Sequence, residues 1–536
     1  MPFELSLTTI YILPFFVLLF GVYWLLKPKW RWIALLVGSA VFYFCVSYKS
    51  LPFLLFSTLS IYAAGSYISA QNRIQKEYLA EHKATLSKEE KSAYKKSIKK
   101  KKKVALVLGI VANVLVLATM KYLDFFLSNV NGIISWFPTS FQIPLPHLFL
   151  PLGISFYTFQ AIGYLADVYW GKFEHESNYA KFALFLIYFP KVIQGPILRY
   201  DRMKEELFGE KEFDMDRVLD GGKRCIYGYL KKLVIADTLV VFVNFAFGDV
   251  YALSGLEMAL AIFFYFIQDY CDFSGYMDIG IGYSEMLGVK MEENFNHPYF
   301  ARGIDDYWRR WHMTLGAWFK DYVFYPLSIS RFSLSLGKRS KSVFKGSFGM
   351  KVPAIFGLTV VWLLTGLWHG ASWNYVLWGA YYGLIIILSV LFEPLFAKFY
   401  AKTGITKDTW FMRVWAHIRT LFLLVVGRLL FICNSPSDAW YVFTHMWNVY
   451  GAEFNIDNLL NQLGYISAIA AVVCAIIVLV IDLIQEHNPT TSFIEKLKKR
   501  PIVLRFALYL GLIALVVWFG YYGSGLPRFE FGYTQF

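Results

Sequence analysis

Cysteine and charged residues are both scarce in this sequence. Its 536 residues include 5 Cys, and charged side chains make up 17% of the chain, against about 25% in an average soluble domain. Five cysteines spread over this length make no paired disulfide framework. The sequence also has no H-E-x-x-H, G-x-S-x-G or G-x-x-x-x-G-K-[ST] motif. These absences argue against a disulfide scaffold, a zinc protease, a serine hydrolase and an ATP-driven pump, and we expect no metal site.

Hydrophobic residues make up 57% of the chain, aromatic residues 19%, and both are spread along its whole length. A membrane-spanning helix needs about 20 mostly apolar residues. Suitable runs occur at 8–26, 31–48, 51–70, 104–121, 225–247, 353–369, 372–393, 412–433, 465–485 and 503–522. Stretches 122–137, 150–170, 179–200 and 255–290 contain Gly, Pro and polar residues, and we expect short, broken or re-entrant helices there. The sequence therefore predicts an all-α polytopic membrane protein with about eleven spans plus partial ones.

The formal net charge of +14 is distributed unevenly. Segment 71–103 holds 12 Lys or Arg against 4 Glu, and because no nucleic-acid-binding signature accompanies it, we expect no nucleic-acid partner. A lysine-rich segment between apolar runs is typical of the cytoplasmic side of a membrane. The remaining loops alternate consistently with this assignment. We therefore expect the 71–103 loop in the cytoplasm and both the N-terminus and the C-terminus outside.

The whole chain, 1–536, is expected to form a single membrane domain, because no soluble domain can be cut out of it. The N-terminal residues lack a basic n-region, so that the first apolar run is expected to be a retained span. The orientation makes 353–393 a hairpin, with Trp368, His369 and Gly370 near its turn.

Ionisable side chains inside apolar runs are costly, which makes each one a candidate for function. His369 is the clearest, because it follows a run of apolar residues and is flanked by small residues that would let a ligand approach closely. The alternative is a buried histidine satisfied by a neighbouring carbonyl or hydroxyl.

Two further clusters stand out. In the first, helical spacing would place Trp308, Trp311, His312 and Leu315 on one face, which also suits an amphipathic helix at the membrane interface. The second, 268–278, carries three carboxylates that cannot all face lipid, and structural ion pairing, with Arg428 as one possible partner, is the main alternative to catalysis.

Six stretches, taken in order, resemble the membrane-bound O-acyltransferase (MBOAT) family. The resemblance is to its branch of alginate O-acetylation and teichoic acid D-alanyl transfer proteins. The stretches are 150–160 (LPLGISFYTFQ), 194–200 (QGPILRY), 272–276 (DFSGY), 294–299 (NFNHPY), 308–315 (WRRWHMTL) and 366–373 (GLWHGASW).

The resemblance implies a bacterial inner-membrane protein with a funnel through the bilayer, a catalytic core at 150–393 and C-terminal helices at 394–536. It also implies that His369 matches the family's signature histidine and His312 its second functional one. The residues we expect to bind substrate are Gln194, Asp272, Ser274, Tyr276, Trp308, Arg310, Trp311, Thr314, Trp368 and Asn374.

From this resemblance we expect an O-acyltransferase that binds no cofactor. The donor would be a cytoplasmic thioester, either acetyl-CoA (or another acyl-CoA) or an acyl-carrier-protein thioester, and a positioned neutral imidazole suits its transfer to a hydroxyl. The expected partners are a polysaccharide acceptor, membrane lipid, and a surface-anchored or secreted acyltransferase. Alternatives are D-alanyl transfer to teichoic acid, a transporter or flippase of lipid-linked sugar, and a structural scaffold for a glycan synthase.

Overall fold

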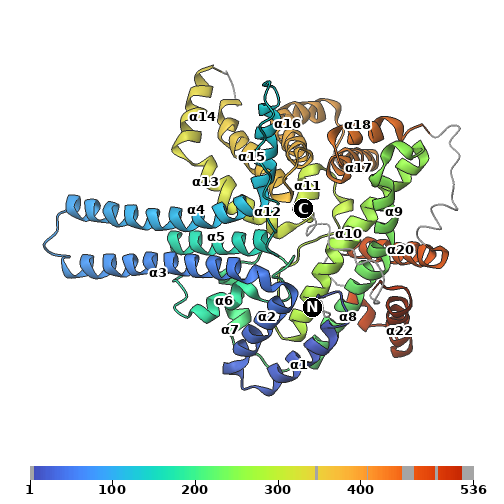
Figure 1. Ribbon diagram of the computed structural model, residues 1–536, viewed down its shortest axis with the longest axis horizontal. Helices are drawn as coiled ribbons and strands as arrows, with labels where there is room; N and C mark the ends of the chain where they lie inside the picture. Colours follow the sequence, from blue (N-terminus) through green and yellow to red (C-terminus); the bar gives the residue numbers. More distant parts are fainter. Residues whose placement is uncertain (1–4, 344–347, 407, 449–463, 489–492, 522–536) are drawn as a thin grey trace. The chain divides into compact units, whose positions relative to one another are not determined.

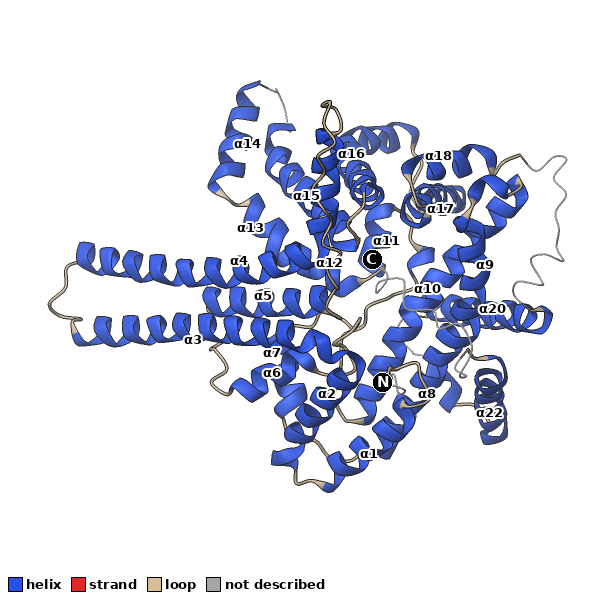
Figure 2. Cartoon of the chain, viewed as in Figure 1, coloured by secondary structure: helices blue, strands red, loops and turns tan. Residues whose placement is uncertain are grey.

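The computed structural model describes residues 5–343, 348–406, 408–448, 464–488 and 493–521. Over these ranges the chain is helical, with connecting loops and no strand (Figure 2). The chain divides into two compact units. The first comprises Met1–Val218 and Ser284–Met291, and the second comprises Leu219–Tyr283 and Glu292–Phe536.

The first unit is built around a long antiparallel helix pair, α3 (Leu51–Glu81) and α4 (Lys88–Ile134), with α5 packed against both (Figure 1). The other α-helices of this unit are α1 (Ile12–Leu25), α2 (Arg31–Ser47), α5 (Ile154–Trp170), α6 (Tyr179–Ile187) and α7 (Tyr200–Phe208).

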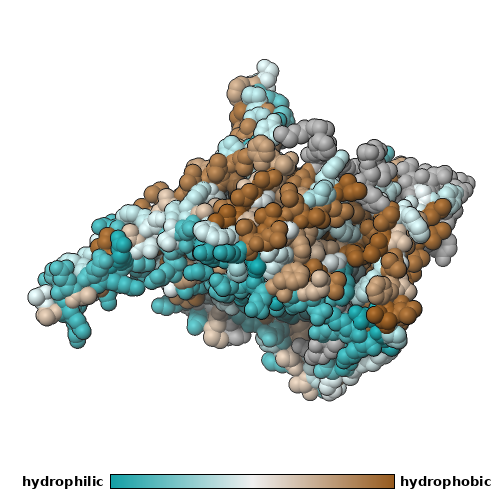
Figure 3. Space-filling model, turned by 90° about the horizontal axis from the view of Figure 1, so that it is seen from below, coloured by the Kyte–Doolittle hydropathy of each residue, from teal (hydrophilic) through white to brown (hydrophobic). Residues whose placement is uncertain are grey.

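The basic segment 71–103, expected as a loop, is instead mostly helical and forms the connected end of the α3–α4 hairpin. Ser87 caps α4 in a capping box: its side chain accepts from Glu90 N at 3.1 Å, and its own N–H donates to the Glu90 carboxylate at 2.8 Å. Tyr78 of α3 lies against Tyr94 of α4, with 4.1 Å between ring centroids. The projecting end is coated with hydrophilic side chains (Figure 3). Local capping and packing thus continue both helices well beyond their apolar parts.

The second unit contains the remaining α-helices, except that the first four residues of the helix starting at Met215 and the last three of the helix ending at Met286 belong to the first unit. They are α8 (Met215–Tyr229), a π-helical turn (Leu230–Ala236), α9 (Asp237–Gly248), α10 (Gly255–Met286), α11 (Ile304–Arg310), α12 (Met313–Phe319), α13 (Tyr325–Ser328), α14 (Arg331–Val343), α15 (Phe348–His369), α16 (Trp373–Thr403), α17 (Trp410–Ile432), α18 (Pro436–His445), α20 (Tyr465–His487), α21 (Phe493–Lys498) and α22 (Ile502–Phe519).

Seven helical segments of the described chain are long and apolar enough to cross a membrane. They are Pro28–Glu81, Lys88–Ile134, Gly349–His369, Trp373–Thr403, Trp410–Ile432, Tyr465–His487 and Ile502–Phe519. The number is smaller than the expected eleven, in part because 8–26 forms only the shorter α1 and 225–247 is interrupted by the π-helical turn. The expected all-α polytopic architecture is confirmed.

Stretch 255–290, expected to be broken, is mostly one continuous helix of 32 residues, α10. The three carboxylates of segment 268–278 are paired rather than exposed to lipid. Asp269 pairs with Arg428, Asp272 with Lys232, and Asp278 with Lys231. These ion pairs satisfy the charges that would otherwise oppose a continuous buried helix.

The expected hairpin at 353–393 is confirmed as α15 and α16, which pack closely against each other on either side of a short turn. A Cβ on Gly366 would collide with the backbone carbonyl of Tyr375, and one on Gly379 with that of Trp362. The glycines therefore let the two backbones approach. This hairpin places His369 at the last residue of α15.

Candidate active site

His312 lies at a sharp break between two helices. The expected continuous helical face is wrong, because α11 ends at Arg310 and α12 begins at Met313, with His312 left-handed at φ 48°. A distant segment holds the break: Asn296 N donates to the Arg310 carbonyl at 2.9 Å, and Met313 N to the Asn294 carbonyl at 3.0 Å. A left-handed non-glycine residue is costly and is maintained by such surrounding contacts.

The Asn294 side chain fixes the orientation of the His312 ring. Its Oδ1 accepts two hydrogen bonds from Thr314, one from the backbone N at 3.1 Å and one from Oγ1 at 2.9 Å. His312 Nδ1 lies 3.1 Å from Asn294 Nδ2 and 3.2 Å from Asn294 Oδ1. Since Thr314 already occupies both lone pairs of Oδ1, we take Nδ2 as the donor to His312 Nδ1. This assigns the His312 proton to Nε2, which makes Nε2 a hydrogen-bond donor.

His312 is 2% exposed and lies outside the seven candidate spans. Burial lowers the pKa of His312 from 6.5 to about 3, since desolvation disfavours the imidazolium. The ring also packs edge-on against Phe273, at 4.8 Å between centroids. His312 is therefore neutral at physiological pH.

His369 is 4% exposed and lies in an aromatic enclosure. Its ring centroid is 4.7 Å from that of Trp378, 5.1 Å from Phe431 and 4.9 Å from Trp368. The sequence suggested that the small residues beside His369 would leave space for a ligand. At Gly370 this space is taken by the Tyr375 ring, which a Cβ on Gly370 would meet.

Trp368 connects the two histidines. Its ring centroid lies 4.9 Å from that of His369 and 5.7 Å from that of His312. Two imidazoles that are 57 residues apart in the sequence thus contact the same indole. Both rings and the indole are buried, so the group can hold neutral proton donors and acceptors in a site with little water.

The other predicted tryptophans are more distant. Trp308 packs against Trp378, which in turn contacts His369, with centroids 5.3 Å and 4.7 Å apart. Trp311 covers the Arg428 guanidinium at 4.4 Å. Trp308 thus supports the aromatic enclosure, whereas Trp311 supports a buried ion pair.

Several predicted substrate-binding residues are engaged elsewhere. Asp272 pairs with Lys232 Nζ at 2.5 Å, and Ser274 Oγ accepts from Lys231 Nζ at 3.0 Å. Arg310 binds Glu486 at 2.8 Å, and Asn374 donates to the Cys433 carbonyl at 2.5 Å. Tyr276 is buried on α10. These interactions hold Asp272, Arg310 and Asn374 in place, and the expected contact of these residues with substrate stays a prediction.

Gln194 belongs to the first unit, unlike the two histidines. It is fully buried, and neither its Oε1 nor its Nε2 has a hydrogen-bond partner among the described residues. A buried amide in this condition needs a partner such as a water or a polar ligand.

Sequence reasoning assigned no role to Asn294, Trp378 or Phe431. Asn294 lies in the stretch 294–299, which carried part of the family resemblance. That resemblance was the one feature of the sequence that could have pointed to Asn294. Trp378 and Phe431 are apolar positions in predicted spans, and nothing in the sequence distinguishes them from lipid-facing aromatics.

The fold and the site together define a multi-pass helical membrane protein with two buried, neighbouring histidines. Residues 173–435 match the sequence model of MBOAT, the membrane-bound O-acyltransferase family. The chain carries an MBOAT domain, and this confirms the resemblance.

Three relatives illustrate the similarity. "Probable alginate O-acetylase AlgI" of Pseudomonas aeruginosa is 32% identical over 359 residues, covering 67% of this chain and 63% of that protein. "Peptidoglycan O-acetyltransferase" of Helicobacter pylori is 33% identical over 326 residues, covering 56% and 58%. "Teichoic acid D-alanyltransferase" of Bacillus subtilis is 29% identical over 308 residues, covering 56% and 71%. The chain thus spans less than two thirds of the first two relatives.

Proposed function

We propose that this protein is an O-acyltransferase that acetylates hydroxyl groups of a cell-surface polysaccharide or cell-wall glycan. The observation that carries the proposal is the contact of His312 and His369 with the same buried indole, Trp368. Support comes from the MBOAT domain and from relatives named as O-acetylases of alginate and peptidoglycan.

In the proposed reaction His369 is the general base. It takes the proton of the acceptor hydroxyl while the oxygen attacks the thioester carbonyl, and the proton then passes to the sulfur as the C–S bond breaks. A thioester and an alcohol thus become an ester and a thiol, and no net proton is released. In a variant of this scheme His369 itself first accepts the acyl group and then passes it on.

His312 is proposed to act as a hydrogen-bond donor. With its proton on Nε2 and its Nδ1 held by Asn294, the ring can bind the acceptor hydroxyl or the developing oxyanion without changing its charge. Trp368 would keep the two rings apart and exclude water between them.

We also propose the route of the acyl group. The donor is a cytoplasmic thioester, acetyl-CoA or an acyl-carrier-protein thioester, and the acyl group crosses the inner membrane to a glycan or to a surface-anchored or secreted acyltransferase. The basic hairpin 71–103 then lies in the cytoplasm, and the two termini lie outside. The charge of that hairpin supports this orientation.

The test is mass spectrometry of surface glycans from a strain that lacks this protein. The strain is complemented with wild-type protein, with His369→Ala, or with His417→Ala, a control histidine that bonds only to the Ala301 carbonyl in the described contacts. We expect His369→Ala alone to abolish ester-linked acetate while membrane protein levels stay equal.

Normal acetate in the His369→Ala strain would contradict the assignment. Loss of ester-linked D-alanine in place of acetate would identify the acceptor as teichoic acid, whose D-alanyltransferase is also a relative. Survival of glycan transport in that variant, with unchanged acylation, would favour a lipid-linked sugar transporter.

A further inference from the structure

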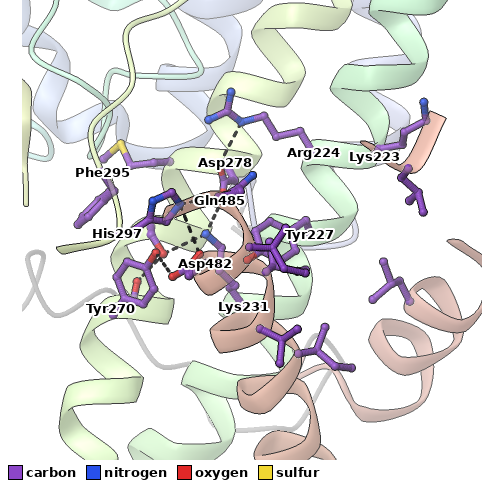
Figure 4. A pocket seen from close by; sticks show the side chains of 18 of the residues that line it. Lys223, Arg224, Tyr227, Lys231, Tyr270, Asp278, Phe295, His297, Asp482 and Gln485 are labelled. Atoms are coloured by element: carbon purple, nitrogen blue, oxygen red, sulfur yellow. Dashed lines mark hydrogen bonds and ion pairs between the residues drawn. The ribbon is translucent and has the colours of Figure 1, made fainter. Parts of the chain in front are cut away.

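A cavity of about 1100 Å³ in the second unit is not used by the proposed chemistry. It lies among α8, α10, α20, α22 and the segment 293–297 (Figure 4). Small-molecule sites usually occupy about 300–1,000 Å³. The volume therefore suits a large or long ligand.

One wall of the cavity is apolar and is made by two candidate membrane spans. Ile476, Val480 and Ile484 recur every four residues along α20, and Leu508, Leu512 and Leu515 recur every three or four residues along α22. Such spacing aligns side chains on one face of each helix. None of the apolar window of α22 is buried inside the protein. A candidate span that the described residues cover so little has a face available to lipid chains.

The rest of the cavity lining is charged but balanced. The cavity is lined by four Lys or Arg and four Asp or Glu side chains, which give no net charge. Most are paired with one another: Arg224 with Glu293 at 2.5 Å, Arg310 with Glu486 at 2.8 Å, and Lys231 with Asp278. The wall therefore presents fixed charges of both signs.

Along α20 the apolar part of the cavity lining comes first and the polar part follows. The polar residues Asp482, Gln485 and Glu486 lie near its C-terminal end, and Ile476 lies deeper in the span. Figure 4 shows Asp482, Gln485, His297 and Lys231 gathered at this polar end. From 476 to 486 the helix rises about 15 Å, which is half of a hydrocarbon layer about 30 Å thick. The cavity thus has the length of one leaflet.

We propose that this cavity binds a phospholipid with a zwitterionic headgroup. Its phosphate would face Lys231 and Arg224, its ammonium would face Asp482 and Glu486, and an acyl chain would lie between α20 and α22. A coenzyme A thioester carries several phosphate charges and no compensating cation, so a wall with no net charge does not suit it. The lipid would also contact Asn294, which lines the cavity and holds the His312 ring.

The experiment measures lipid retained by the full chain. The protein is purified from nanodiscs containing either phosphatidylethanolamine or phosphatidylglycerol, and bound lipid is counted by native mass spectrometry; acetyl-CoA is tested as a third probe. Leu512→Trp fills the apolar end of the cavity. Gly511→Leu does so from a residue whose added Cβ would meet no atom within 4 Å. Leu510→Trp is the matched control, since Leu510 is 61% exposed and does not line the cavity.

We expect wild-type protein and the Leu510 control to retain phosphatidylethanolamine in preference to phosphatidylglycerol. Both filling variants should retain about tenfold less, because excluding roughly two methylene groups from the site changes affinity by about that factor. Equal retention by a correctly folded Leu512 or Gly511 variant and the control would overturn the proposal. It would also be overturned by equal retention of both lipids, or by acetyl-CoA displacing the lipid. None of these outcomes depends on acyl transfer.

Discussion

Substitution of Asn294 tests whether His312 works through one fixed tautomer. Asn294→Ala removes the donor to His312 Nδ1 and the acceptor of two bonds from Thr314. Leaving buried polar groups without partners costs about 1–3 kcal/mol. If that cost falls on the transition state, the rate drops roughly 5- to 150-fold.

Asn294→Asp gives the sharper result. The aspartate keeps the acceptor for Thr314 but cannot donate to His312 Nδ1, so the imidazole proton would move from Nε2 to Nδ1. We expect this variant to be as impaired as Asn294→Ala. A nearby carboxylate would also raise the pKa of His312 from its low value, since an opposite charge favours the imidazolium.

The assay is the initial rate of glycan acetylation in proteoliposomes, per amount of monodisperse protein. Asn296→Ala is the control, because it keeps the backbone bond to Arg310 at the same break. Wild-type activity in Asn294→Asp would refute the tautomer assignment. A fall in folded protein with unchanged activity per molecule would show that Asn294 only stabilises the fold.

Three further predictions concern stability, measured by unfolding in detergent. As the pH falls from 6.5 toward 3, unfolded His312 takes up a proton that the folded residue refuses, so wild-type protein should lose up to about 1.4 kcal/mol per pH unit relative to His312→Gln; parallel pH profiles would contradict this. Arg428→Met strands the Asp269 carboxylate and should cost about 3–5 kcal/mol, whereas pairing it with Asp269→Leu should recover most of that loss; no recovery would argue against the ion pair. Gly366→Ala should destabilise the α15–α16 hairpin, but Gly21→Ala, where an added Cβ meets nothing within 4 Å, should not; equal effects would exclude close backbone packing as the reason for Gly366.

Hydropathy was sufficient to predict the class of fold, because apolar length is a local property. The hairpin that presents His369 was predictable for the same reason. The continuity of α10 was not, because its Gly and polar residues suggested interruptions. Ion pairing of its carboxylates was expected with Arg428 as one possible partner, and Asp269 does pair with Arg428. The partners Lys232 and Lys231 were not expected, because no pattern within 268–278 indicates them.

The two candidate histidines could be picked out from the sequence, but the geometry around them could not. Helical spacing around His312 favoured a continuous helix. The break depends on backbone hydrogen bonds to 294–296, a segment that is not adjacent in the sequence, so no local pattern around His312 indicates it. Asp272 and Asn374 were expected to bind substrate because they are polar within apolar runs. In the structure they contact Lys232 and the Cys433 carbonyl, and their binding of substrate stays a prediction.

The length of α4 has a consequence for how soluble proteins would meet this protein at the membrane surface. At about 1.5 Å per residue its 47 residues extend about 70 Å, more than twice a hydrocarbon layer of about 30 Å. Its lysine-rich part, 88–103, alone accounts for about 24 Å, which is longer than the headgroup region on one side of a bilayer is thick. The first unit therefore carries a long helix whose lysine-rich part extends beyond the length needed to cross the hydrocarbon layer. Because lysine is in excess over acid there, we expect this part of the helix to attract an acidic soluble protein electrostatically.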